Sequence, residues 1–185
     1  MDYEANVNAT LLRSTYADQQ EGRVWYDKAN EICLGIAMET CHDTDTVAAV
    51  IAALSPRVKW DRNIRDAYNY CLAAAQGGEM PPSTAFGKCK AKAWKIATQQ
   101  AQWQDVLKGP KVTSFVANLT GDLQPVTVDS WVIRLATGWA KDEVKEKEYR
   151  AIEAVYQDMA VRHGLKPAQL QAITWVTARR LGRMN

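Results

Sequence analysis

Apolar residues in the first part of the chain recur with the spacing of one helix face. They stand three, four or seven positions apart, which indicates that one side of a long helix is buried. The residues that define this face are Trp25, Ala29, Ile32, Cys33 and Ile36. No strand–helix–strand alternation appears along the chain, and the runs of β-branched residues are too short to build the core of a sheet.

Helical spacing continues beyond this first helix, and capping or breaking residues divide it into segments. Asp43 can cap the apolar run VAAVIAAL, and Pro56 ends that helix. A further helix is expected from Trp60 to Leu72. The sequence QGGEMPPST, residues 76–84, then breaks the pattern before a lysine-rich helix, and we expect a boundary between two helical lobes there.

The second half of the chain shows the same alternation of helices and turns. A short helix near 103–107, a tight turn at 108–110 and a helix over 111–119 follow one another. Residues 128–130 then open another helix, and two long helices close the chain, the last with Pro167 in its first turn. The pattern predicts an all-α fold in which residues 1–185 form one domain of two helical lobes with a cleft between them.

Composition narrows the class of protein. Hydrophobic residues make up 47% of the 185 residues, which is enough for a sizeable core, and no apolar run is long enough to span a membrane. The first ten residues, MDYEANVNAT, do not resemble an export signal, so we expect a cytoplasmic location. We also expect a monomer. The four cysteines form no CxxC pair and there are only two histidines, which argues against a zinc site and favours free thiols.

Charge is unevenly distributed although the net charge is only +2. Residues 87–111 hold six lysines and one acid, and three arginines lie near the C-terminus. The basic residues concerned are Lys88, Lys90, Lys92, Lys95, Lys108, Lys111, Arg179, Arg180 and Arg183. Such a run is most often a solvated helix face. Gly109 favours a phosphate-binding role over a solvated helix face, because a glycine turn before a helix lets backbone amides approach a phosphate. We therefore expect phosphate contacts near this turn.

Asp129 stands where a helix should begin, in the sequence VTVDSWVIRL. By itself, such a residue more often caps the helix. A carboxylate at this position can also face a cleft, where it can stabilise a developing positive charge or deprotonate a water molecule. Both roles remain open from the residues alone.

Three segments, taken in order, resemble the helix-hairpin-helix DNA glycosylase superfamily, which has the endonuclease III-like fold. They are AALSPRVKWDRN (52–63), LKGPKVTSFVANLTGD (107–122) and PVTVDSWVIRLA (125–136). The lysine-rich GKCKAKAWKI resembles the helix that precedes the hairpin, so the resemblance covers roughly residues 43–140, with the hairpin region at 103–120. The chain also resembles small phage-type members of this superfamily.

The resemblance implies roles for individual residues. Arg57 falls at the position that wedges into the duplex, and Gly109 falls on the later glycine of the hairpin. Lys111 falls on the lysine that bifunctional members use as a nucleophile, and Asp129, 18 positions further on, falls on the catalytic aspartate. No cysteine follows Cys89, so the iron–sulfur cluster of many relatives is not expected, and we expect no cofactor.

The function implied is removal of a damaged or modified base from double-stranded DNA, with or without Schiff-base lyase activity. We expect further DNA contacts from Trp60, Lys88, Lys90, Lys108 and Ser130. Two alternatives remain: a transferase that acts on a hypermodified thymine without releasing it, and a DNA-binding protein without turnover. A phage-encoded protein would act in the cytoplasm of its host. The residues alone do not decide whether Lys111 is a nucleophile or a phosphate contact.

Overall fold

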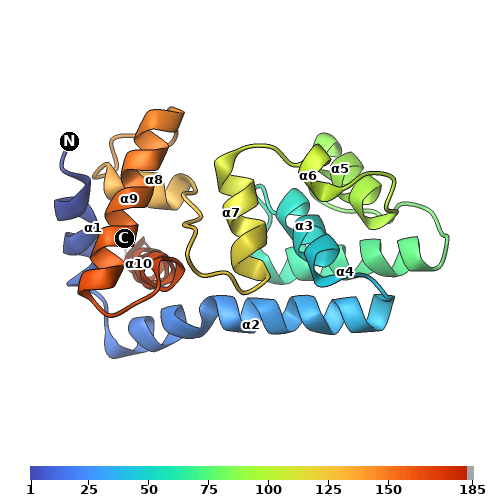
Figure 1. Ribbon diagram of the computed structural model, residues 1–185, viewed down its shortest axis with the longest axis horizontal. Coiled ribbons are helices and arrows are strands. Elements are labelled where there is room, and N and C mark those ends of the chain that lie inside the picture. Colours follow the sequence, from blue (N-terminus) through green and yellow to red (C-terminus); the bar gives the residue numbers. More distant parts are fainter. Residues whose placement is uncertain (183–185) are drawn as a thin grey trace. The chain divides into compact units, whose positions relative to one another are not determined.

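The computed structural model describes residues 1–182, which form ten helices and no strand (Figure 1). The all-α prediction is therefore confirmed for this part of the chain. The helices are α1 (Tyr3–Leu11), α2 (Tyr16–Thr40), α3 (Thr44–Leu54), α4 (Trp60–Ala75), α5 (Gly87–Ala97), α6 (Trp103–Val106), α7 (Pro110–Leu119), α8 (Ser130–Ala136), α9 (Glu146–Arg162) and α10 (Pro167–Gly182). Arg183 lies outside the described residues. Within 1–182, no helix is both long and apolar enough to cross a membrane.

The chain divides into two compact units, which are described separately below. The first unit contains residues 1–28 and the chain from Gly121 onward, and the second contains residues 29–120. The helix α2 contributes its beginning to the first unit and its remainder to the second. The break at 76–84, where a lobe boundary is expected from the sequence, lies inside the second unit, and α4 and α5 on its two sides pack against each other there.

The core of the first unit forms where α1, α8, α9 and α10 pack together (Figure 1). Val7 comes from α1, Val132 from α8, Ile152 and Tyr156 from α9, and Leu170 from α10; each of them is fully buried. Burying an apolar side chain of this size contributes about 1.5–3 kcal/mol. The loop from Gly121 to Asp129 runs over this core and adds buried valines to it.

The first turns of α2 pack against α10 within the same unit at a glycine. A Cβ atom built on Gly22 would lie 2.5 Å from the Cα atom of Ile173. No side chain fits in that space, so only glycine permits this approach of the two backbones. By contrast, a Cβ atom on Gly35, further along α2, would meet nothing within 4 Å.

The second unit is built around α3. Every residue from Thr46 to Leu54 is buried, because α4, α5 and α7 surround this helix. A helix that is apolar all round is typical of such a central position. Asp43 caps it as predicted: its carboxylate accepts hydrogen bonds from the Thr46 backbone N–H (2.6 Å) and from the Thr46 hydroxyl (2.8 Å).

Candidate functional site

A strained turn joins α3 to α4 in the second unit and presents Arg57 to solvent. The Val58 N–H donates to the Ser55 carbonyl oxygen (3.1 Å), and Arg57 has a φ of 61°. Pro56 restricts the preceding φ to negative values, so the turn is of type II, whose third position normally holds glycine. A side chain in the left-handed region costs about 1–2 kcal/mol. Arg57 is thus exposed at the expected wedge position, on a backbone that is costly for an arginine.

Phe86 lies beside Arg57. The guanidinium carbon of Arg57 is 6.0 Å from the centre of the Phe86 ring, within the range of a cation–π contact. Phe86 is the residue before α5, and its side chain is 48% exposed. The sequence patterns did not single out Phe86; an aromatic residue directly before a lysine-rich helix is the signal that marks it.

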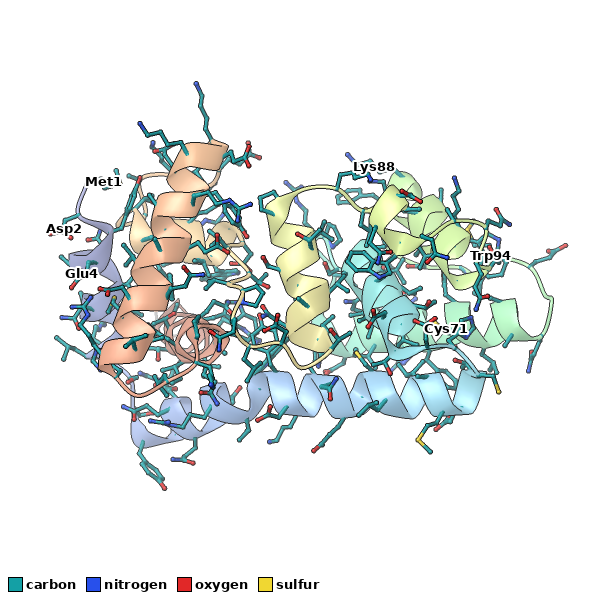
Figure 2. All side chains as sticks on the ribbon, viewed as in Figure 1. Met1, Asp2, Glu4, Cys71, Lys88 and Trp94 are labelled. Atoms are coloured by element: carbon teal, nitrogen blue, oxygen red, sulfur yellow. The ribbon has the colours of Figure 1, made fainter. Side chains whose placement is uncertain are left out.

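The lysine-rich helix predicted from the sequence is α5, which begins one residue after Phe86. Its apolar side, with Cys89, Ala93 and Ile96, is buried in the second unit. Lys88, labelled on α5 in Figure 2, is exposed, whereas Lys90 is half-buried. All arginines and lysines of the second unit come from two segments of its chain, 57–65 and 88–111. The Arg57–Phe86 contact brings these two basic segments together.

Trp60 and Asn63 start the helix that follows the strained turn. Trp60 is the first residue of α4 and is half-buried, so only part of its ring is accessible for the DNA contact expected from the sequence. Asn63 is buried and donates from Nδ2 to the Ile51 carbonyl oxygen of α3 (3.1 Å). This hydrogen bond holds the start of α4 against α3 and so fixes the two ends of the turn.

The predicted hairpin region consists of the short α6, a turn and α7. Leu107 is buried at the end of α6, and Gly109 precedes α7 with a φ of 104°, a value that side chains rarely adopt. Pro110 takes the first position of α7, where its missing N–H costs nothing. The turn is therefore formed by the residues that the sequence indicated for it.

The two lysines of this turn have different surroundings. Lys108 donates from Nζ to the Gln104 carbonyl oxygen (2.6 Å) and lies 4.0 Å from a carboxylate oxygen of Asp105, so it is directed back along α6. Lys111 is exposed in the first turn of α7 and has no ion-pair partner among residues 1–182. Lys111 is consequently the more accessible of the two cations.

Asp129 caps α8 in the first unit. Its carboxylate accepts a hydrogen bond from the Val132 N–H (2.9 Å), and the residue is half-buried. Ser130 follows as the exposed first residue of α8. The capping role anticipated from the sequence is thus present, and it fixes the carboxylate at one place on the surface of the unit.

Tyr149 holds the backbone that leads to Asp129. Its hydroxyl, on α9, donates to the Val126 carbonyl oxygen (3.1 Å) and accepts from the Val128 N–H (3.3 Å). Both valines are buried. Because Val128 is the residue immediately before Asp129, this clamp restricts where the carboxylate can lie.

Two further buried tyrosines lie within electrostatic reach of Asp129. Tyr26 donates to the Gln171 Oε1 atom (2.9 Å), and the hydroxyls of Tyr156 and Thr174 share a hydrogen bond (3.1 Å). Burial raises the pKa of both tyrosines, and the negative charge of Asp129 raises it further. Both hydroxyls therefore stay protonated beside the carboxylate.

Sequence reasoning missed this tyrosine cluster, because Tyr26 lies more than a hundred residues before Tyr149 and Tyr156 in the chain. The structure places the predicted residues in two groups. Asp129 and Ser130 belong to the first unit, and the other predicted contacts belong to the second. Those in the second unit are Arg57, Trp60, Lys88, Lys90, Lys108, Gly109 and Lys111.

Comparison with known proteins identifies a family. Residues 1–181 match DUF7178, a family of unknown function. The chain belongs to this family. No curated protein and no solved structure matches the chain. The DUF7178 match spans both units, so Arg57, Lys111 and Asp129 all lie within the matched residues.

Proposed function

We propose that this protein is a DNA glycosylase-like enzyme that flips a damaged or modified base out of duplex DNA and cleaves its N-glycosidic bond. The observation that carries the proposal is the backbone of Arg57, an exposed side chain held in the left-handed region next to an exposed phenylalanine. Strained residues concentrate at functional sites, because the strain persists only where the surrounding structure imposes it.

Base extrusion requires a group that enters the duplex and a surface that holds the phosphates. Unstacking one base costs a few kcal/mol, which an inserted side chain offsets by filling the gap. Arg57 and Phe86 offer one charged and one aromatic group at a single place on the second unit. The lysines of α5 and of the turn at Gly109 can contact phosphates, which gives affinity without reading sequence.

Cleavage of an N-glycosidic bond develops positive charge on the sugar. A fixed carboxylate stabilises that charge or directs a water molecule at it, as in glycoside hydrolysis. In this proposal Asp129 supplies the carboxylate. Its hydrogen bond from Val132 and the Tyr149 clamp support the role, because electrostatic stabilisation depends on groups that do not have to reorganise during the reaction.

Lys111 distinguishes a hydrolase from a lyase. If its neutral amine attacks the sugar C1′ atom, the bond from C1′ to the base breaks and the base leaves with a proton from the amine. Opening of the sugar ring at the C1′–O4′ bond, with the second amine proton passing to O4′, then gives an imine between Nζ and C1′. Borohydride added during turnover would reduce that imine to a stable protein–DNA adduct, and Lys111→Gln should abolish it. Lys147→Gln, an exposed lysine of the first unit, is the control. Base release without any adduct assigns Lys111 to phosphate binding and the reaction to water.

The proposal is tested by product analysis. The protein is incubated with duplexes that contain uracil or oxidised bases and with DNA from a phage that carries hypermodified thymine, and the products are identified by mass spectrometry. A free base and an abasic strand support the glycosylase. An altered nucleoside that is still attached to the strand contradicts base release and supports the transferase alternative. Tight duplex binding with unchanged DNA would identify a binding protein instead.

A further inference from the structure

A strained aromatic residue lies in the first unit, just beyond α8. Trp139 has a φ of 66°, and it follows Gly138, which has a φ of 60°. Two successive left-handed residues suit glycine, and a tryptophan at the second position is strained. The Trp139 side chain is nevertheless 58% exposed, so burial of the ring does not compensate for the strain.

Trp139 meets Trp131 of α8 edge to face. The ring centroids are 5.8 Å apart and the ring planes are 84° apart. Trp131 is half-buried and stands two positions after Asp129. The two rings form an aromatic surface, here called the tryptophan pair, and Trp131 belongs to the helix that the Asp129 carboxylate caps.

Two cations close to the tryptophan pair, Arg134 and Lys141, each have a carboxylate partner. The Arg134 guanidinium lies 5.7 Å from the centre of the Trp131 ring, and its Nε is 2.5 Å from a carboxylate oxygen of Asp142. Lys141, two residues after Trp139, is paired with Glu148. A surface of this kind suits an uncharged planar group better than a phosphate, because Arg134 and Lys141 already have counter-charges.

We infer that the tryptophan pair is the stacking surface for the extruded nucleobase. The inference rests on the proposed function and deepens it by assigning recognition of the base to Trp139 and Trp131. Every base has a π-face, so stacking on tryptophan binds the base whatever its substituents. The Trp139 ring is exposed, so an incoming base can reach it, and its strained backbone is of the kind that concentrates at functional sites.

Photo-cross-linking tests the inference directly. A duplex that carries 5-iodouracil in a mismatch is bound to the full-length protein and irradiated, and the adduct is mapped by peptide mass spectrometry. The expected adduct lies on the peptide that contains Trp139. Trp139→Gly, which also relieves the strained backbone, should lower the adduct yield about tenfold, and Trp139→Phe should keep most of it.

The controls separate this inference from the proposed function. Tyr16→Ala removes an aromatic side chain of the same unit that is 79% exposed, and it should leave the adduct unchanged. Tyr16→Ala should also leave duplex affinity unchanged. Duplex binding with no adduct at either tryptophan overturns the inference alone. A second result would also overturn the inference: the parent protein self-associates in sedimentation, and Trp139→Gly abolishes this self-association but leaves the adduct intact. Trp139 would then form a contact between two copies of the chain. A parent protein that binds no duplex overturns both proposals.

Discussion

The guanidinium of Arg57 lies over the ring of Phe86, with its central carbon 6.0 Å from the ring centre. This contact joins the type II turn before α4 to the residue before α5, and it places a cation and an aromatic ring at one exposed point. A turn required only for folding would be better served by glycine at position 57, because glycine adopts a positive φ without strain.

Arg57→Gly should therefore separate stability from function. Relief of left-handed strain, about 1–2 kcal/mol, exceeds the entropic cost of a freer backbone, about 0.4–1 kcal/mol. We expect a slightly higher melting temperature and a large loss of base release. Gln99→Gly, at another position with a φ of 55° in the same unit, should gain similar stability and keep full activity. Equal activity of the two variants would remove Arg57 from the mechanism.

Reversing charge on α5 should weaken DNA binding in a salt-dependent way. Lys88→Glu with Lys92→Glu changes two exposed positions of this helix. Each lost phosphate contact lowers the slope of log K against log salt by about 1, so the slope should fall by about 2. Lys147→Glu with Lys166→Glu makes the same change of net charge on the first unit and should leave the slope unchanged. Identical salt titrations for the two double variants would show that α5 does not contact DNA.

Most helices can be predicted from the sequence because their apolar spacing and caps are local. Asp43 and Pro167 mark helix starts by chemistry that needs no tertiary contact. The N-terminal helix α1 cannot be predicted in this way. Among its nine residues only Val7 is buried, and its place depends on packing against α8, α9 and α10, far along the chain.

In the candidate site too, features set by local residue types can be predicted and features set by tertiary packing cannot. Glycine is typical of a turn with a positive φ and aspartate is typical of a helix cap, so the places of Gly109 and Asp129 at the starts of α7 and α8 can be predicted. The Tyr149 clamp on residues 126–128 cannot, because a hydrogen bond across more than twenty residues depends on how α9 packs. The backbone conformation of Trp139 cannot be predicted either, since nothing in its local sequence indicates a left-handed tryptophan.

Two glycines of α2 should respond to alanine with opposite signs. Gly22→Ala would place a Cβ atom 2.5 Å from the Ile173 Cα atom and force α2 away from α10. We expect a loss of about 1–3 kcal/mol, as for overpacked cores. Gly35→Ala meets nothing within 4 Å and should gain up to about 1 kcal/mol from helix propensity. Chemical denaturation measures both variants. A Gly22→Ala protein as stable as the parent would contradict the packing of α2 on α10.

The Asp18–Arg180 ion pair should make stability depend on pH. Burial alone would raise the pKa of Asp18, but the Arg180 guanidinium and the Thr15 backbone N–H outweigh it and hold the pKa below its usual range. A lowered folded-state pKa stabilises the fold at neutral pH. That stabilisation is lost as the pH falls below about 3.9, the ordinary value for aspartate, toward the folded-state value.

Asp18→Asn should accordingly lower the free energy of unfolding at pH 7 by about 1–2 kcal/mol and flatten its decline in acid. The matched control is Glu4→Gln, which removes an ion pair with Arg162 in which both side chains are 49% exposed. Solvent screens such a pair, so little change is expected. Parallel acid denaturation curves for the parent and Asp18→Asn would show that this pair does not control the acid limb.

Asp129 bears most directly on the proposed chemistry, and its cap can be tested apart from its charge. Asparagine caps a helix almost as well as aspartate, so Asp129→Asn should fold normally. Asp43→Asn makes the same replacement at the cap of α3 and should leave catalysis unchanged. The decisive measurement is the rate of base release from the duplex on which the parent turns over. The account predicts a loss of about a hundredfold or more for Asp129→Asn. An unchanged rate in the folded Asp129→Asn protein would contradict it.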